Sequence, residues 1–367
     1  MPSSDPIATL LETYHDLNPS VVEEFPHQNE EPSPLEFLRY VSRNRPCVFR
    51  GAAKRWPALQ KWDARFLRDA MRGRKVRVAV TPAGNADAVV EQATGELVFT
   101  EPHEIEESFE DFLDDVQNDS SATPPNKAKA RNVKYAQTQN NNLPTEYSPL
   151  TPDLPPTLPF ARIALNQSAE EGPEALNFWL GNARSTTALH KDNYENLYVA
   201  VRGRKHFVLL APVEMACVNE GRVRRGRFVR DCASSSFSSS GAGAVDDDHG
   251  SETLKVEIDK DGEPLPVPLW DPDDPLKHTT PYSHLAQPLR VTLYEGDMLY
   301  LPAMWYHKVT QSVGDEGFAC AVNYWYDMAF DSAFWASNCF LRDVVEAGRQ
   351  RVVYPELDLA GEEEGGT

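Results

Sequence analysis

The chain has 367 residues, of which 41% are hydrophobic, so it is long enough to bury a sizeable core and lacks the composition of a disordered protein. The formal net charge of −20 disfavours nucleic acids and anionic membrane surfaces and favours a basic partner or substrate, although acidic charge also simply keeps proteins in solution. The N-terminus has no secretory signal, no apolar run could span a bilayer, and the five cysteines form no CxxC pair. These features predict a soluble protein of the cytoplasm or nucleus, with no nucleic-acid or membrane partner.

Residues 1–130 are predicted to form a layer of short helices and strands that packs on the rest of the chain. Apolar residues at helical spacing predict helices over residues 8–17, 34–44 and 56–74. An acidic amphipathic helix is predicted over residues 104–117, with Ile105 and Phe109 on its apolar side. Two short strands, 45–51 and 75–82, are also predicted in this layer, and residues 120–130 are typical of a surface loop.

Residues 131–327 are predicted to form a β-rich core. Short strands separated by Gly, Pro and Asn turns are predicted over residues 132–139, 175–181, 196–201, 205–212, 291–302, 306–313 and 319–326. Such a series is typical of an antiparallel sandwich or barrel, in which residues 196–210 are expected to form a hairpin that turns at Gly203. Trp179, Trp305 and Trp325 lie in or near these strands and are predicted to be packing residues rather than substrate contacts.

Three further segments complete the predicted organisation. Residues 232–262 form a low-complexity insertion rich in Ser and Asp, expected to be weakly ordered. Residues 328–350 are predicted to be helical, and residues 351–367 form an acidic tail.

The segment STTALHKDNYENLYVAV contains a pair of candidate metal ligands. Residues two apart on a strand point to the same face, so His190 and Asp192 could offer an imidazole and a carboxylate to one metal ion. Among the nine histidines, His307 in LYLPAMWYHKVTQ is the best candidate for a third ligand. Two histidines and one carboxylate on one face of an octahedral ion form the triad that non-heme Fe(II) oxygenases use. An HxD pair alone is weak evidence, because it arises by chance in many chains.

Nearby polar residues strengthen this hypothesis. Lys205, on the strand after the HxD pair, could place its ammonium group opposite a carboxylate at the end of a narrow pocket. Thr187 and Asn196 flank the pair and offer short polar groups. Each of these residues alone would be an ordinary surface or strand-edge residue, but the combination is much less likely to arise by chance.

Longer segments around these residues resemble the jumonji-C oxygenases of the cupin-like group. They include RPCVFRGAAKRWPALQKW, YAQTQNNNLPTE, NFWLGNARSTTALHKDNYENLYVAVRGRKHFVLLAP, MLYLPAMWYHKVTQS and AVNYWYDM. The similarity spans about residues 30–340 and, within the group, points to lysyl hydroxylases of developmentally regulated GTP-binding proteins. It implies a fold that is mainly β with flanking helices, namely a double-stranded β-helix of the jelly-roll type. It also implies Fe(II) as cofactor and a reaction in which 2-oxoglutarate and O2 give succinate and CO2 while a protein lysine is hydroxylated at C3.

The same resemblance implies roles for individual residues. Lys205, Thr187 and Tyr135 would bind the 2-oxoglutarate carboxylate, and Asn196 and Asn323 would line the pocket. Composition and spacing alone give no reason to choose Tyr135 or Asn323, since each could be an ordinary strand residue in a β core.

Other functions remain open at this stage. Demethylation of methyl-lysine, or hydroxylation of another residue type, would use the same iron chemistry. A non-catalytic cupin-like binding protein is a third possibility, although the complete triad together with Lys205 argues against it. A peptidase activity has been attributed to relatives, but the sequence shows no nucleophile or zinc motif that supports it.

The C-terminal segment also suggests an assembly. Residues 327–349 are predicted to be helical, with Phe330, Phe334 and Leu341 along one face and Phe340 beside it. Such a stripe must be covered, either by the chain's own N-terminal helices or by a partner. Related hydroxylases pair through such terminal helices, so the resemblance favours a homodimer.

Overall fold

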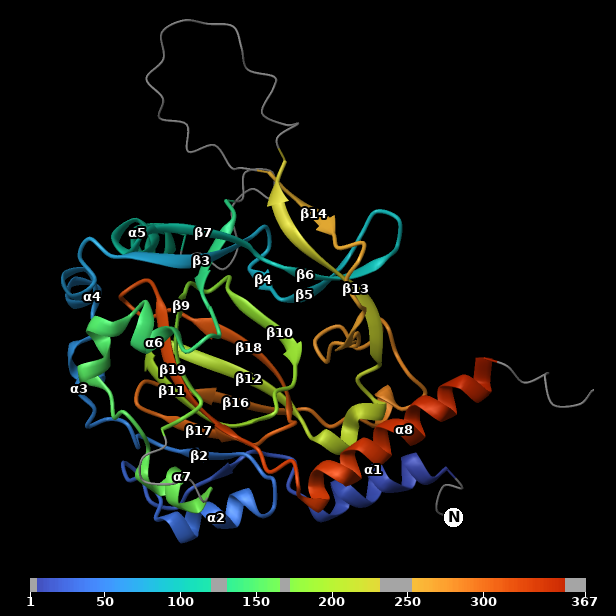
Figure 1. Cartoon of the computed structure of the whole chain (residues 1–367). Helices are drawn as coiled ribbons and strands as arrows, with labels where there is room; N and C mark the ends of the chain where they lie inside the picture. Colours follow the sequence, from blue (N-terminus) through green and yellow to red (C-terminus); the bar gives the residue numbers. More distant parts are fainter. Residues whose placement is uncertain (1–4, 120–130, 166–171, 232–252, 354–367) are drawn as a thin grey trace, which may run out of the picture.

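The structure is a computed structural model of the chain, and it describes residues 5–119, 131–165, 172–231 and 253–353. Its strands form three sheets (Figure 1). The largest has the order β1-β2-β17-β11-β19-β9-β8-β3-β7, the second β16-β12-β18-β10-β4, and the third β14-β13-β6-β5 with β15 added on β13. Within these described ranges, no helix has the length and apolar character needed to cross a bilayer.

The nine-stranded sheet combines strands from distant parts of the chain. Its strands are β1 (Glu23–Glu24), β2 (Cys47–Phe49), β3 (Lys75–Thr81), β7 (His103–Ser108), β8 (Val133–Ala136), β9 (Ala175–Gly181), β11 (Tyr194–Arg202), β17 (Met298–Leu301) and β19 (Ala319–Asp327). Strand β11 lies between β17 and β19 and is antiparallel to both. At the far end, β3 and β7 extend the sheet beyond β8, so it contains strands from both sides of residue 130.

The second sheet packs against this one and forms the other half of the jelly roll. Its strands are β4 (Asn85–Ala86), β10 (Thr186–His190), β12 (Arg204–Leu210), β16 (Leu289–Leu293) and β18 (Tyr306–Ser312). One hydrophobic cluster combines side chains from both sheets, among them Tyr198 and Ala321 from the first and Phe207 and Val309 from the second. The predicted fold, mainly β with flanking helices, is therefore confirmed.

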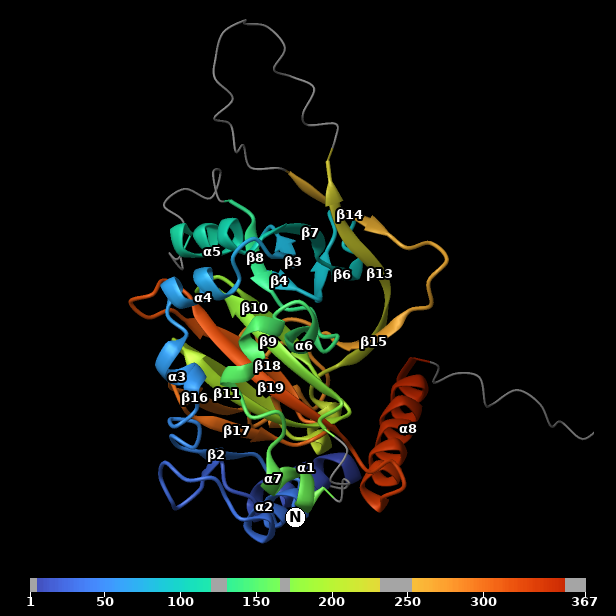
Figure 2. The ribbon, with the colours of Figure 1, turned by 60° about the vertical axis from the view of Figure 1, so that its left-hand side comes forward.

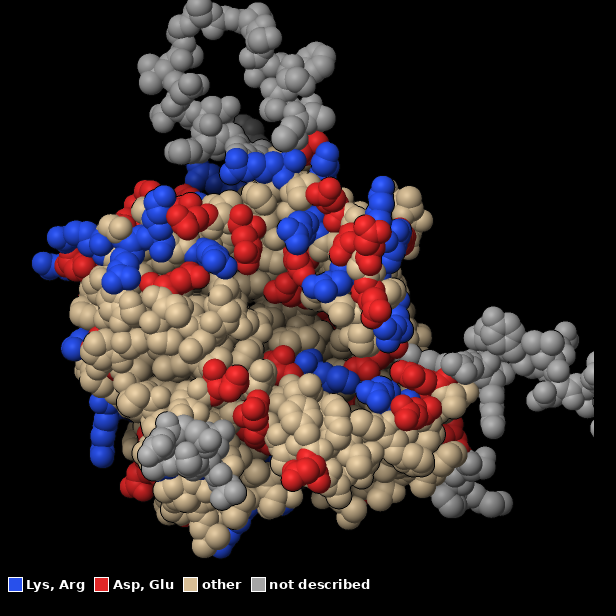
Figure 3. Space-filling model, viewed as in Figure 1, with Lys and Arg blue, Asp and Glu red and all other residues tan. Residues whose placement is uncertain are grey.

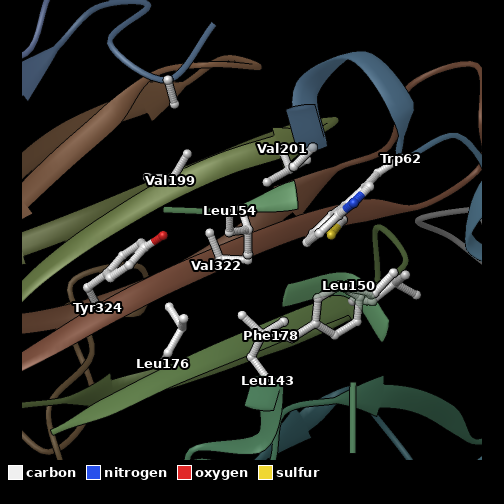
Figure 4. Packing of buried hydrophobic residues seen from close by; sticks show 14 of the residues in the cluster. Trp62, Leu143, Leu150, Leu154, Leu176, Phe178, Val199, Val201, Val322 and Tyr324 are labelled. Atoms are coloured by element: carbon white, nitrogen blue, oxygen red, sulfur yellow. The ribbon is translucent and has the colours of Figure 1, made fainter. Parts of the chain in front are cut away.

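Short helices cover the outer face of the nine-stranded sheet. They are α2 (Pro34–Val41), α3 (Pro57–Lys61), α4 (Ala64–Ala70), α5 (Phe109–Asn118), α6 (Asn142–Thr145) and α7 (Pro159–Ala164). Their apolar side chains join the largest hydrophobic cluster, in which Trp62 and Leu143 meet Phe178 of β9 (Figure 4). The start of α2 is fixed by a capping box, in which Ser33 and Glu36 bond reciprocally to each other's backbone N–H. This layer buries one face of the sheet and leaves the other face for the site.

Two helix predictions in the N-terminal layer were wrong in extent. The helix predicted over residues 56–74 is divided into α3 and α4, because the Asp63 side chain accepts a hydrogen bond from the Phe66 N–H at 2.7 Å and starts a new helix. The helix predicted over residues 104–117 begins only at Phe109, with Ser108 as its N-cap. The preceding residues form β7, an edge strand rich in glutamate, which is a common way to protect a sheet edge.

The hairpin predicted over residues 196–210 is also absent. The chain does turn at Gly203, whose φ of +67° suits glycine and whose added Cβ would lie 2.6 Å from the Ser312 carbonyl oxygen. However, β11 pairs with β17 and β19, whereas β12 pairs with β16 and β18. Because both edges of each strand are occupied, Gly203 carries the chain from one sheet to the other.

A third sheet stands beside the jelly roll and was mostly missed from the sequence. It consists of β5 (Ala88–Glu91), β6 (Leu97–Glu101), β13 (Glu220–Arg230), β14 (Leu254–Ile258) and β15 (Leu265–Pro268). Strand β14 lies inside the predicted weakly ordered insertion and pairs with β13, so the prediction for 232–262 was too wide at its C-terminal end. Residues 232–252 of the insertion and the predicted loop 120–130 lie outside the described residues.

Helices α1 (Pro6–Leu17) and α8 (Ala333–Val353) pack beside each other at one end of the molecule (Figures 1 and 2). The C-terminal helix was predicted from residue 327, but α8 starts six residues later, at Ala333. Leu341 joins a cluster that contains Ile7 and Leu11 of α1, and Phe334 packs in a smaller cluster with Met304. The chain itself thus covers much of the predicted apolar stripe.

Candidate active site

His190, Asp192 and His307 converge at one point between the two sheets of the jelly roll. In β10 and β18, His190 lies directly opposite His307, next to an irregularity in the strand register. The Asp192 Oδ2 atom lies 3.6 Å from the Nε2 atom of each histidine. The ligand atoms of all three residues lie within 4.8 Å of one another, a spacing that suits one metal ion. One detail of the sequence argument was wrong, because β10 ends at His190 and Asp192 lies in the following loop.

Backbone carbonyls orient both imidazoles. The Nδ1 atom of His190 lies 2.8 Å from the Ala188 carbonyl oxygen, and Nδ1 of His307 lies 3.0 Å from the Trp305 carbonyl oxygen. If each Nδ1 carries the proton and donates it, each Nε2 lone pair is free to face the metal position.

The loop that carries Asp192 is held by its own backbone and by Lys191. The Met304 N–H donates to the Asp192 carbonyl oxygen at 2.8 Å. Lys191 forms an ion pair with Glu220, and its Nζ atom donates to the Tyr306 hydroxyl at 3.0 Å. These contacts replace the strand pairing that would otherwise fix the direction of the carboxylate.

The charges of the three residues are coupled. Burial lowers the pKa of His190, but the adjacent Asp192 carboxylate outweighs it and raises that pKa above its ordinary value. Burial and the nearby charge of His190 lower the pKa of His307 to about 4. Burial opposes ionisation of Asp192, but both histidines hold its pKa below the ordinary value. A divalent cation requires an ionised carboxylate and two neutral imidazoles, so the shifts of Asp192 and His307 favour metal binding, whereas His190 would have to release any proton that it holds.

A pocket opens over this triad. It is lined by Gln139, Trp179, Thr187, His190, Asp192, Asn196, Tyr198, Phe207, His307, Val309, Asn323 and Trp325. Three of the five predicted co-substrate residues, Thr187, Asn196 and Asn323, therefore reach it. Trp179 and Trp325 also line it, although each is only 6% exposed, so their prediction as packing residues rather than substrate contacts stays a prediction.

Lys205 and Tyr135 lie beside the pocket rather than in its lining. Lys205 is completely buried, and its Nζ atom bonds to the side-chain oxygen of Gln311 and lies 3.5 Å from the Tyr135 hydroxyl. On β12 it precedes the pocket residue Phe207 by two positions, which places both side chains on the same face. Within the described part of the chain, no carboxylate forms an ion pair with Lys205. Burial accordingly lowers its pKa to about 7.

Sequence reasoning missed two polar residues in this corner. Gln311 lies opposite Lys205 in the strand pairing, and only 5% of it is exposed. The buried Ser185 hydroxyl has no hydrogen-bond partner in the described chain. A Cβ on Gly181 would lie within 2.9 Å of atoms from Ser185, Tyr135 and Gln311, so these side chains surround one small space. The period of two along β18 from His307 could have revealed Gln311; nothing in the sequence marks Ser185.

The two asparagines form a hydrogen-bonded chain along one wall. The indole Nε1 of Trp179 donates to Asn323 Oδ1 at 2.7 Å, and Asn323 Nδ2 donates to Asn196 Oδ1 at 3.2 Å. Asn196 is 4% exposed and Asn323 is 1% exposed, so this chain is fixed before any ligand enters.

Comparison with known proteins places this geometry in a family. A model described as "Cupin-like domain" matches residues 33–332. The chain is 38% identical over 310 residues to the human protein named bifunctional peptidase and (3S)-lysyl hydroxylase JMJD7, an alignment that covers 83% of this chain and 85% of that protein. The chain belongs to the cupin-like jumonji-C family, whose members are 2-oxoglutarate oxygenases.

Two further relatives carry different names. The chain is 34% identical over 327 residues to the Arabidopsis thaliana protein named lysine-specific demethylase JMJ32, covering 86% of this chain and 85% of that protein. It is 32% identical over 317 residues to JmjC domain-containing protein E of Dictyostelium discoideum, covering 82% of this chain and 83% of that protein. The family as predicted from sequence is confirmed. The residues of the site fit the cofactors of this family, since two imidazoles and a carboxylate suit Fe(II) and the unpaired Lys205 suits an anionic co-substrate.

Proposed function

We propose that the protein hydroxylates a lysine side chain of another protein, with His190, Asp192 and His307 as the Fe(II) ligands. The observation that carries this proposal is a metal-ligand triad close to a buried cation that lacks a counter-ion. A buried charge without a partner is costly, and the distal carboxylate of 2-oxoglutarate is a partner of the right sign and size.

The other polar residues have complementary tasks in this proposal. Lys205 and the Tyr135 hydroxyl hold the co-substrate carboxylate, with Thr187 as a further donor. Asn196 and Asn323 form the polar wall beside the metal. When bound, iron and 2-oxoglutarate supply the oxidising chemistry, in which one oxygen atom of O2 enters a C–H bond and the other enters succinate. The protein orients both reactants and keeps bulk water from the reacting C–H bond.

A lysine substrate is supported by two independent facts. The human relative carries (3S)-lysyl hydroxylase in its name. The net charge of −20 favours the approach of a basic segment. The resemblance of the sequence to hydroxylases of developmentally regulated GTP-binding proteins makes such a protein our first choice of substrate.

Demethylation of methyl-lysine is the second candidate, and the name of the Arabidopsis relative favours it. Both reactions need the same triad, so they differ only in the side chain that is accepted. A non-catalytic binding protein would bind metal without consuming 2-oxoglutarate. A peptidase would cleave a substrate polypeptide without consuming 2-oxoglutarate.

The test is to incubate purified protein with Fe(II), 2-oxoglutarate and matched peptides from a GTP-binding protein that contain lysine or methyl-lysine. Succinate formation together with the gain of one oxygen on the lysine peptide supports the proposal. Loss of a methyl group from the methyl-lysine peptide alone would favour demethylation. Metal binding without any succinate would exclude both oxygenase reactions.

We also propose that two copies associate through the part of α8 that the chain leaves uncovered. Phe340 is 71% exposed, and Leu17 at the end of the neighbouring α1 is 77% exposed. Neither side chain belongs to the cluster that the two helices share, so both are available for a two-fold interface. The cytoplasmic or nuclear location stays a prediction from the sequence.

A further inference from the structure

Asp87 is a partly buried carboxylate next to the strand that carries His190. It follows β4, whose Ala86 pairs with Thr187 of β10, and it precedes β5, which belongs to the third sheet. At this junction its φ is +51°, in the left-handed region that few residues other than Gly, Asn and Asp adopt. A backbone conformation of this kind, held beside a reactive centre, is a reason to look for a function.

The surroundings of Asp87 supply no lysine or arginine as its counter-ion among the described residues. The Gln137 side-chain N–H donates to Asp87 Oδ2 at 2.8 Å. The charged groups that face it are His190 from β10, Glu101 from β6 and Glu104 from β7, and the two glutamates add negative charge.

Asp87 and Lys205 therefore present the same physical problem with opposite signs. Lys205 is fully buried and Asp87 is partly buried, each is hydrogen-bonded to a neutral amide side chain, and neither forms an ion pair with a residue of the described chain. Among the described residues, the one opposite charge that faces Asp87 is that of protonated His190, a form that metal binding would remove. Lys205 is explained by the carboxylate of the co-substrate. Asp87 would be stabilised by a cation. When C3 of a substrate lysine faces the metal, the ammonium group at the end of the same side chain lies further away and needs an anionic partner of its own.

A second feature points to a ligand in the pocket over the metal triad. Trp325 is 6% exposed, lines the pocket, and its indole Nε1 has no partner in the described chain. Its ring stacks on Tyr194 with centroids 4.7 Å apart. Gln139, which lines the pocket, follows Gln137 by two residues, so the segment that bonds to Asp87 also reaches the pocket. Figure 3 shows a hollow near the centre of one face of the molecule, with both acidic and basic side chains around it.

We propose that Asp87 binds the ammonium group of the substrate lysine and thereby sets the preference for a cationic side chain. The proposal rests on lysine hydroxylation as the function. It predicts that the protein distinguishes lysine from an uncharged side chain of the same length through one carboxylate rather than through its general negative field.

The experiment compares Asp87→Asn with wild type on two peptides, one with lysine at the target position and one with norleucine. Asparagine keeps the size of the side chain and tolerates the left-handed backbone, so the variant should fold. Glu104→Gln is the matched control, because it removes the same charge from an exposed position that faces Asp87. Peptide affinity is measured by fluorescence anisotropy with Mn(II) and 2-oxoglutarate without O2, and turnover by succinate release.

In wild type and Glu104→Gln, the lysine peptide should bind much more tightly than the norleucine peptide. In Asp87→Asn this preference should fall by about 10- to 100-fold, while the apparent affinity for 2-oxoglutarate stays unchanged. An unchanged preference in Asp87→Asn would overturn the inference, as would equal weakening of both peptides. Failure of wild type to hydroxylate any lysine peptide would instead refute the proposed function, so the two failures are distinguishable.

Discussion

Replacing Lys205 with methionine should make the ligand-free protein more stable and should abolish its response to 2-oxoglutarate. Burial lowers the pKa of Lys205 from 10.5 to about 7, and each pKa unit corresponds to about 1.4 kcal/mol. The buried charge therefore destabilises the ligand-free fold by up to roughly 5 kcal/mol at neutral pH, and structural relaxation will reduce this value. Methionine fills a similar space without a charge, so a gain of about 1–3 kcal/mol in the free energy of unfolding is expected.

The effect has a defined pH window. The unfolded state binds the proton more tightly than the folded state, so wild-type stability should rise between about pH 7 and pH 10.5. Below pH 7 the lysine is protonated in both states and the penalty is constant. The groups that face Lys205 are Tyr135 of β8, Gln311 of β18 and Cys320 of β19; burial raises the pKa of Tyr135 above its ordinary value and that of Cys320 to about 12. None of them supplies an opposing negative charge within this window.

Urea unfolding of the two proteins, with and without Zn(II) and 2-oxoglutarate, measures both effects. Wild type should gain stability from 2-oxoglutarate, whereas Lys205→Met should not. Lys134→Met is the control, because Lys134 lies 2.6 Å from carboxylate oxygens of both Glu107 and Asp115 and its loss should destabilise the protein. A ligand-free Lys205→Met protein that is less stable than wild type, or that 2-oxoglutarate still stabilises, would refute the assignment of Lys205.

Three other predictions concern the metal, the substrate and the assembly. Alanine at His190, Asp192 or His307 should weaken Mn(II) binding in calorimetry on the order of a hundredfold with a native circular dichroism spectrum, and wild-type affinity in any variant would remove that residue from the site. Trp325→Phe removes an unpaired donor but keeps an aromatic ring, so the Kd of the peptide should rise about 3- to 10-fold while the 2-oxoglutarate requirement stays constant. An equal rise in the peptide Kd and in the 2-oxoglutarate requirement would contradict a substrate contact. Phe340→Asp should turn a dimer into a monomer in light scattering with little change in Tm, because the ring is 71% exposed, and a monomeric wild type at micromolar concentration would refute the dimer.

The sequence predicted those features that depend on local pattern. Alternating apolar residues located β9, β12 and β18, and the HxD spacing located two members of the triad. It could not show that β11 and β12 belong to different sheets, because a glycine turn between two apolar strands looks the same in a hairpin and in a crossing between sheets. Strand β13 escaped notice because five arginines interrupt its apolar pattern.

The site shows the same division between local and tertiary information. Thr187, Asn196 and Lys205 can be selected from the sequence because they are polar residues close to a metal-ligand motif, where a co-substrate would bind. Ser185 and Asp87 do not, since their significance lies in missing partners, which only the folded chain reveals. Absence of a hydrogen bond or of a counter-ion has no signature in a single sequence.

The position of Asp192 shows how closely the metal site depends on tertiary contacts. Because β10 ends at His190, the carboxylate is positioned by the loop and not by strand pairing. That loop bonds to the Met304 N–H, three residues before His307, and Met304 itself has a φ of +70°. The conformation of one ligand's segment therefore constrains another's, and a metal ion that binds both would stabilise a backbone that is otherwise strained. Together with the unpaired charges of Lys205 and Asp87, this arrangement makes the ligand-free site a locally unfavourable part of a well-packed fold, one that metal, co-substrate and substrate each stabilise.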